Sequence, residues 1–288
     1  MLVIKFRTLV IYILIAVFTV CTFGSFLSRD ITASVNLPDD GVKLPILMYH
    51  GITDEASKIS RYVISKKMFK EDLEYLSQMG YTTVTADEVI AYVKGEGELP
   101  QKPIILTFDD GYYNNYCYGY PLLKEYNAKA VISIIGKYTD MYTELEEENP
   151  AYSHITWTEG TEMMESGLVE FQNHSYDLHS LDKGRRGAGK KKGEAEEEYQ
   201  KMLKADIGLL QEKMQENTGY TPTTFAYPFG SISEASYSVL DEMGLIASFA
   251  CEEKVNIITK GDLNCLKCMN RFLRSDKKSA QKILESID

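Results

Sequence analysis

Basic residues are scarce in this sequence relative to acidic ones. The 288 residues include 31 Lys and Arg against 42 Asp and Glu, a formal net charge of −11 at pH 7. Nucleic-acid binding depends on clustered Lys and Arg, so we expect no nucleic-acid partner. No internal repeat is evident, which argues against a solenoid. With 44% hydrophobic residues, the chain can still bury the core of one large domain.

Cysteine and histidine are also rare. Beyond the N-terminal segment there are four cysteines, Cys117, Cys251, Cys265 and Cys268, which allow three disulfide pairings that the sequence cannot separate. The Cys265-Leu-Lys-Cys268 segment has no second such pair or nearby histidine to complete a zinc site, so a structural disulfide or plain thiols are favoured. The chain has only four histidines, which makes the position of each one informative.

An apolar segment opens the chain. Lys5 and Arg7 precede an uncharged stretch from Thr8 to Gly24, the pattern of an export signal with its positive flank in the cytoplasm. No clear cleavage site follows. We therefore expect residues 1–25 to be a membrane anchor that holds the rest of the chain outside the cell; a cleaved signal and a secreted protein are the alternative. Residues 26–43 are polar and are expected to form a linker.

Short apolar runs alternate with helical patterns from residue 44 to the C-terminus. In the first predicted helix, Phe69, Leu73 and Leu76 recur at helical spacing on one face. The alternation predicts a single α/β domain, residues 44–288, built on a parallel sheet. Residues 182–198 combine a basic block, an acidic block and four glycines. We interpret them as a mobile surface loop leading into a helix, although the basic half could contact an anionic cell-wall polymer.

Four of the apolar runs end in polar or turn residues. They lead into His50, into Asp109 and Asp110, into His174, and into residues 228–230 (Pro-Phe-Gly). The carboxyl ends of parallel strands lie on one face of a sheet or barrel, and functional sites are built there. The sequence therefore predicts that four distant segments converge on one rim.

Two adjacent carboxylates end one of these runs, in the segment TFDDG. Buried at a strand end, Asp109 and Asp110 are costly unless a cation or hydrogen bonds compensate their charge. A divalent metal ion would do so. Adjacent side chains diverge, so one carboxylate can bind the metal while the other acts as a base. The alternative is an ordinary turn, because Asp-Gly is a common turn dipeptide.

Two histidines lie close together in the segment NHSYDLHS. On a helix, His174 and His179 would be separated by roughly 140°, so joint binding of a metal ion requires a loop or turn. Two imidazoles and one carboxylate leave positions open for water and substrate, as in catalytic zinc sites. A pair of surface histidines is the alternative.

The motifs TFDDG, HSYDLH and YPFG, in this order, resemble those of the polysaccharide deacetylase (NodB-homology) family of carbohydrate esterases. The resemblance covers roughly residues 44–275 and implies an irregular (β/α) barrel with a divalent metal ion. Within the family, the chain is most similar to the poly-N-acetylglucosamine deacetylases of biofilm formation. Those proteins also carry an L-x-Y-H element, matched here by Leu47-Met48-Tyr49-His50.

The resemblance implies a role for each motif residue. Asp109 is the catalytic base, and the metal ligands are Asp110, His174 and His179. No histidine follows His179 to serve as the general acid, and by resemblance to the biofilm deacetylases His50 takes that place.

The chain departs from the family pattern at the residue that orients the base. The pattern R-x-P-[FY]-G begins with an arginine, but this chain has Ala226 there. Arg271 is a candidate substitute, and a surface salt bridge is the alternative role for it. By resemblance, the backbone N–H of Phe229 in the same motif helps to hold the oxyanion.

These features predict a metal-dependent hydrolase that removes N-acetyl groups from an extracellular N-acetylglucosamine polymer. Zinc is favoured, with nickel, cobalt or iron as alternatives. Peptidoglycan or chitin oligomers are alternative substrates, and an inactive sugar-binding barrel is the alternative function. Sugar rings could stack on Tyr112, Tyr113, Tyr116 or Trp157, although Trp157 also fits the core. We expect a monomer.

Overall fold

The computed structural model describes residues 41–181 and 184–287. The chain divides into two compact units, Met1–Asp39 and Asp40–Asp288, and the described residues all belong to the second. The predicted membrane anchor, residues 1–25, lies outside the described residues, as does most of the predicted linker. Among the helices of the described part, none is long and apolar enough to cross a membrane.

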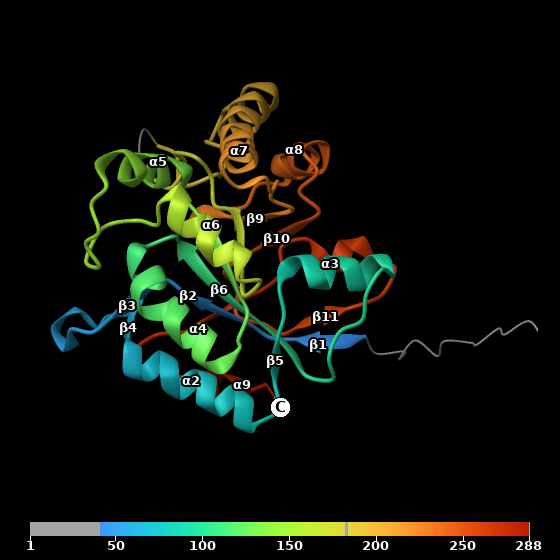
Figure 1. Cartoon of the computed structure of the whole chain (residues 1–288). Helices are drawn as coiled ribbons and strands as arrows, with labels where there is room; N and C mark the ends of the chain where they lie inside the picture. The colour runs from blue at the N-terminus through green and yellow to red at the C-terminus, as the bar shows by residue number, and fades with distance from the viewer. Residues whose placement is uncertain (1–40, 182–183, 288) are drawn as a thin grey trace, which may run out of the picture. The chain divides into compact units, whose positions relative to one another are not determined.

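A curled, eight-stranded parallel sheet forms the centre of the second unit (Figure 1). Seven strands follow the order β10-β9-β8-β7-β6-β2-β12, and β5 pairs with β6 beside this path. The strands are β2 (Ile46–Tyr49), β5 (Thr82–Thr83), β6 (Pro103–Asp110), β7 (Ala130–Ile134), β8 (Val169–Asn173), β9 (Thr224–Ala226), β10 (Ala247–Phe249) and β12 (Phe272–Leu273). The predicted parallel α/β architecture is confirmed, and the sheet has the form of a half-barrel.

The chain just before β12 approaches the opposite edge of this sheet. Phe249 of β10 pairs with Met269 in an isolated parallel bridge, and the Ala250 N–H donates to the Met269 carbonyl oxygen. Phe272 then pairs with Leu47 of β2. Residues 269–273 therefore contact both edge regions of the curled sheet, and this placement matters for the site described below.

Helices lie outside the sheet (Figure 1). They are α2 (Lys66–Gln78), α3 (Ala86–Lys94), α4 (Tyr120–Tyr126), α5 (Gly136–Leu145), α6 (Trp157–Glu165), α7 (Glu196–Thr218), α8 (Tyr237–Glu242) and α9 (Ala280–Leu284). In α2 the predicted apolar face is confirmed, because Phe69, Leu73 and Leu76 are all buried. The Ser65 side chain caps this helix by accepting from the Met68 N–H.

Several short elements were not predicted. Strand β1 (Val42–Leu44) pairs antiparallel with β11 (Asn256–Ile258), and β3 (Gly51–Thr53) pairs with β4 (Val63–Ser65). Because β1 begins at Val42, the last residues assigned to the linker belong to the folded unit. Helix α3 carries a sequence signal that could have revealed it: Thr85 and Glu88 form a capping box.

Within the predicted surface loop of residues 182–198, residues 187–189 are buried. The interpretation of this segment as a mobile surface loop is therefore wrong for these three residues. Ala188 has no exposed surface, and its carbonyl oxygen accepts from the Tyr199 hydroxyl at 2.8 Å. A Cβ on Gly187 would lie 2.5 Å from the Pro228 carbonyl oxygen, so only glycine fits there. The loop leads into α7 as predicted, and residues 182–183 lie outside the described part.

Deleting residues 1–30 is expected to leave a soluble, folded protein. All of the described core lies at Leu44 or beyond, so the deletion removes none of its contacts. A cooperative thermal transition, recorded by circular dichroism without detergent, would confirm the prediction. Aggregation, or the absence of a cooperative transition, would show that the first 30 residues belong to the core.

Candidate active site

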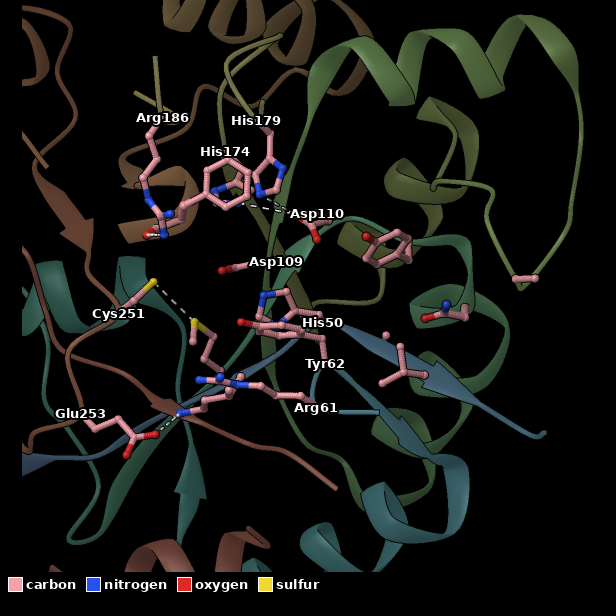
Figure 2. Close-up of a pocket in the computed structure, with 18 residues that line it drawn as sticks. His50, Arg61, Tyr62, Asp109, Asp110, His174, His179, Arg186, Cys251 and Glu253 are labelled. Carbon is pink, nitrogen blue, oxygen red and sulfur yellow. Dashed lines mark hydrogen bonds and ion pairs between the residues drawn. The ribbon is translucent and has the colours of Figure 1, made fainter. Parts of the chain in front are cut away.

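The carboxyl ends of the central strands surround a cleft of about 630 Å³ (Figure 2). His50 follows β2, the two aspartates end β6, His174 follows β8, and Phe229 lies in the turn after β9. The predicted residues that line this cleft are His50, Asp109, Asp110, His174, His179 and Phe229. The predicted convergence of four segments on one rim is confirmed.

The two aspartates point in different directions (Figure 2). Asp110 has φ 74°, in the left-handed region, and Gly111 follows with φ 71°. A Cβ on Gly111 would lie 2.8 Å from Ile134 Cγ2, so the turn requires glycine. Both carboxylates are buried, at 3% and 5% exposure. The Asp-Gly turn therefore exists, but it serves to separate two buried carboxylates.

Asp110 faces the two histidines of the second motif. Its Oδ1 lies 3.5 Å from His174 Nε2 and 3.3 Å from His179 Nε2. The histidines lie on a loop rather than a helix, and Ser175 between them has φ 77°. Potential ligand atoms of these three residues all lie within 4.8 Å of one another. This spacing suits a common divalent ion, and it is the arrangement that the loop or turn was predicted to allow.

Further contacts prepare these ligands for a metal ion. His174 Nδ1 lies 2.7 Å from the Ala226 carbonyl oxygen, so Nδ1 carries the proton and Nε2 presents its lone pair to the cleft. Asp110 Oδ1 is buried and has no hydrogen-bond partner among the described residues. Burial favours a higher pKa for Asp110, but the neighbouring histidines outweigh it and hold the pKa below its ordinary value. The side chains therefore fit a divalent metal ion.

Asp109 is held by Arg271. The guanidinium Nη1 and Nη2 donate to the two carboxylate oxygens at 2.7 and 2.9 Å, a bidentate pair. Arg271 has no exposed surface, and its Nε also donates to the Ala250 carbonyl oxygen at 2.9 Å. Burial alone would raise the pKa of Asp109, but the charge of Arg271 holds it below the ordinary value. The surface salt bridge considered for Arg271 is therefore wrong.

The arginine approaches from a part of the chain far from the YPFG motif. Ala226, at the position of the family arginine, is buried at the end of β9 and contributes only its carbonyl oxygen to the site. Arg271 lies directly before β12, in the segment that bridges to β10. Its guanidinium stacks over the Phe249 ring, with Cζ 5.3 Å from the ring centroid. Asp109, the predicted base, thus has an arginine partner despite the altered motif.

Replacing Arg271 with Ala is expected to lower turnover with little loss of bound metal, and to destabilise the fold by about 3–5 kcal/mol because Asp109 is left buried without its partner. Burial would then raise the pKa of Asp109, so the acidic limb of the pH–rate profile should move to higher pH. Arg271→Lys keeps the charge without the bidentate geometry and should recover more stability than turnover. Unchanged turnover and an unchanged acidic limb would contradict this role for Arg271.

His50 lies across the cleft from His174 and His179 (Figure 2). Its backbone carbonyl oxygen accepts from Asn115 Nδ2 at 2.7 Å, and its ring lies beside Tyr62 with centroids 4.9 Å apart. Nδ1 is buried and has no hydrogen-bond partner in the described part of the chain. Burial lowers the pKa of His50 below its ordinary value. Asn115 thus holds the backbone of His50, and the ring makes no hydrogen bond to Asp109 or Asp110 in the described part of the chain.

Phe229 adopts an unusual backbone conformation beside His179. Its φ of 57° lies in the left-handed region, which is strained for a bulky residue and is typical of functional sites. The ring centroid lies 4.2 Å from that of His179. The turn therefore brings the Phe229 backbone and ring to the cleft beside a predicted ligand.

The four aromatic residues considered for sugar stacking are separated in the structure. Tyr112 lines the cleft. Tyr113 and Tyr116 do not, and their hydroxyls donate to Glu148 and Glu162. Trp157 is buried in the core, as its alternative interpretation required.

Several other cleft residues were not predicted as site residues; they are Arg61, Tyr62, Arg186, Cys251 and Glu253. All five lie on loops, outside the recognised motifs. The four described cysteines are free thiols, so no disulfide forms among the described residues. Cys251 Sγ lies 3.8 Å from Arg271 Nη2, beside the buried ion pair.

Comparisons with known proteins point to one family. Residues 96–247, more than half of the chain, match the polysaccharide deacetylase family. Over 199 residues, the chain is 28% identical to the poly-beta-1,6-N-acetyl-D-glucosamine N-deacetylase of Staphylococcus aureus. The match covers 69% of this chain and 64% of that protein, so it spans slightly less than two thirds of the relative.

Two solved structures have a similar fold. IcaB from Ammonifex degensii aligns with a TM-score of 0.70 and 27% identity, over 85% of this chain and 96% of that one. The de-N-acetylase from Aggregatibacter actinomycetemcomitans aligns with a TM-score of 0.72 and 25% identity, over 85% and 99%. The family match and the motif residues gathered around one cleft lead to the same conclusion: the chain belongs to the polysaccharide deacetylase family.

Proposed function

We propose that this protein is a metal-dependent N-deacetylase that hydrolyses N-acetyl groups on N-acetylglucosamine units of an extracellular polysaccharide. The main support for the proposal is that the two neighbouring carboxylates, Asp109 and Asp110, have different partners. Asp110 faces His174 and His179, while Asp109 is bound by Arg271. One carboxylate can thus bind a metal ion while its neighbour remains free to accept a proton. The names of the Staphylococcus aureus relatives favour poly-β-1,6-N-acetylglucosamine as the substrate.

The metal ligands would be Asp110, His174 and His179. A divalent ion held there would supply Lewis-acid chemistry, polarising the acetyl carbonyl and lowering the pKa of a bound water. The ligand set suits zinc, and nickel, cobalt or iron are alternatives. The Ala226 carbonyl oxygen fixes the tautomer of His174, so that residue is ready to bind without rearrangement.

The other cleft residues would move protons and hold charge. Asp109, kept ionised by Arg271, accepts a proton from the attacking water. His50, on the opposite side of the cleft, donates a proton to the leaving amine. Its lowered pKa makes the imidazolium a stronger acid but also reduces the fraction of His50 that is protonated at neutral pH, so turnover should fall as the pH rises through this pKa. The backbone N–H of Phe229 helps to stabilise the oxyanion, and acetate and a free glucosamine unit are the products.

The alternative of an inactive sugar-binding barrel is weakened by Arg271. That alternative depended on the missing motif arginine, but a buried bidentate arginine contacts the proposed base. Peptidoglycan and chitin oligomers remain alternative substrates. We also propose that residues 1–25 anchor the protein in the cell membrane with the catalytic unit outside, or that they are cleaved and the protein is secreted; the export pattern of these residues supports this location.

Acetate release from a panel of polymers tests the proposed function. Protein lacking residues 1–30, loaded with zinc, nickel or cobalt, is incubated with poly-β-1,6-N-acetylglucosamine, chitin oligomers and peptidoglycan. We expect the highest kcat/KM for the β-1,6-linked polymer. Higher activity on chitin or peptidoglycan would change the substrate but keep the reaction, whereas no acetate from any of the three would contradict the proposed function.

A further inference from the structure

Two arginines lie on opposite sides of the proposed catalytic residues (Figure 2). Arg186 lies on the side of His174 and His179, and Arg61 lies with Tyr62 on the side of His50. Both arginines line the cleft, and both are exposed. A sugar chain that follows the cleft from Arg61 to Arg186, with one acetyl group at Asp109 and Asp110, would pass near both guanidinium groups.

An aromatic ring positions each of these arginines. Arg61 Cζ lies 5.5 Å from the Tyr62 ring centroid, and that ring lies 4.9 Å from the His50 ring. On the other side, Arg186 Cζ lies 5.4 Å from the Phe229 centroid, which lies 4.2 Å from the His179 ring. Each positive charge is thus within about 10 Å of a site histidine, the screening length at 0.1 M salt.

The negative charges of the cleft are already matched by other groups. Asp109 is paired with Arg271, and Asp110 faces the two histidines and the proposed metal ion. Glu253 binds Lys278 at 2.5 Å and accepts from the Leu273 N–H.

Neither Arg61 nor Arg186 has a carboxylate partner among the described residues. Arg186 donates only to the Phe229 carbonyl oxygen, at 3.4 Å, and Arg61 makes no hydrogen bond in the same part of the chain. The cleft therefore carries two unpaired positive charges on a chain whose net charge is −11.

These charges act differently on the substrate and on the product. An N-acetylglucosamine unit is neutral, but each deacetylation creates an amine that is protonated at neutral pH or below. We propose that Arg61 and Arg186 select against a free amine on the sugar units beside the one being deacetylated. This inference rests on the proposed function and adds a specificity to it. Free amines should then be spaced along the polymer instead of lying in adjacent pairs.

Defined oligomers test the selectivity. The substrates are a fully acetylated β-1,6-N-acetylglucosamine pentamer and pentamers with one free amine beside the central unit, at about pH 6, where the amine is protonated. The kcat/KM for removal of the central acetyl group is expected to fall about three- to tenfold for each arginine near the amine. The difference should shrink as salt is raised, because exposed charges are screened.

Two charge-removing variants identify the residues responsible. Arg61→Gln and Arg186→Gln should each reduce the discrimination between the pentamers, and the double variant should nearly abolish it. Lys192→Gln is the matched control: it makes the same charge change in the loop that carries Arg186, but Lys192 does not line the cleft. The control should keep the wild-type ratio. Binding of the fully deacetylated pentamer gives a second readout, and it should tighten in both cleft variants but not in the control.

The outcomes separate this inference from the proposed function. Discrimination that persists in the double variant, or that does not depend on salt, would overturn the role of the arginines while leaving the deacetylase intact. No acetate release from the fully acetylated pentamer would overturn the favoured β-1,6-linked substrate and, with it, the selectivity, whereas only the absence of acetate from every polymer of the panel would overturn the deacetylase itself.

Discussion

Asp110→Ala, His174→Ala and His179→Ala are each expected to remove the bound metal and reduce acetate release to background. The three residues supply the whole predicted ligand set, and their ligand atoms lie within 4.8 Å of one another. Loss of a residue that merely supports a ligand costs about 10- to 100-fold in metal affinity, and loss of a ligand should cost more. Elemental analysis of the purified variants, together with acetate release, measures both effects.

Asp177→Ala is a matched control for these variants. Asp177 lies between the two histidines, but its carboxylate is exposed and pairs with Lys137 at 3.0 Å. This variant should keep its metal and most of its activity. If the three ligand variants bound metal as tightly as Asp177→Ala does, the assigned ligand set would be wrong.

His50→Ala is expected to keep the fold and the metal but to lose roughly 10²–10⁴ in turnover, the usual contribution of a positioned proton donor. The ring lies across the cleft from His174 and His179, and its Nδ1 is buried without a partner among the described residues. His50→Asn should lose a similar amount, because an amide of comparable shape cannot donate the proton. Turnover of an N-acetylglucosamine oligomer, metal content and thermal stability are measured together.

A substrate with a better leaving group distinguishes proton donation by His50 from other roles of this residue. The loss should be much smaller for an activated acetate ester, whose leaving group hardly needs a proton. A variant that lost its metal would show that His50 is a ligand. A variant that lost stability while its folded fraction stayed fully active would show that His50 only packs against Tyr62.

The sequence predicted the rim of the sheet because that prediction depends on local patterns. Apolar runs that end in polar residues mark strand ends, and parallel strands place those ends together. The divergence of Asp109 and Asp110 was also predictable, since neighbouring side chains on a strand point to opposite sides. The structure adds the reason that the divergence persists: the left-handed conformation of Asp110 followed by Gly111.

The partner of Asp109 could not be derived from spacing. Arg271 lies 162 residues further along the chain, and the contact exists because the segment before β12 reaches across to β10. No local sequence pattern predicts that the segment before β12 contacts β10. The resemblance to a family suggested that an arginine was needed and made Arg271 a candidate, and the curled sheet shows how Arg271 reaches Asp109.

The composition of the loop after His179 also led to a wrong prediction of its burial. Its charge and glycine content are typical of a solvated segment, yet Ala188 is fully buried and Gly187 fits against Pro228. Glycine there serves close packing, which composition alone cannot distinguish from flexibility. The same packing presents Arg186 to the cleft, so the composition of the loop does not reveal that this arginine lines the cleft.

The most direct test of the account is the removal of acetyl groups from a β-1,6-N-acetylglucosamine oligomer before and after metal removal, followed by mass spectrometry. Protein lacking residues 1–30 is stripped with a chelator and then reloaded with zinc, nickel or cobalt. The account predicts no acetyl loss from the stripped protein, and recovery that is complete at one metal ion per chain and absent in Asp110→Ala. Full activity of the stripped protein, or equal recovery in Asp110→Ala, would contradict it.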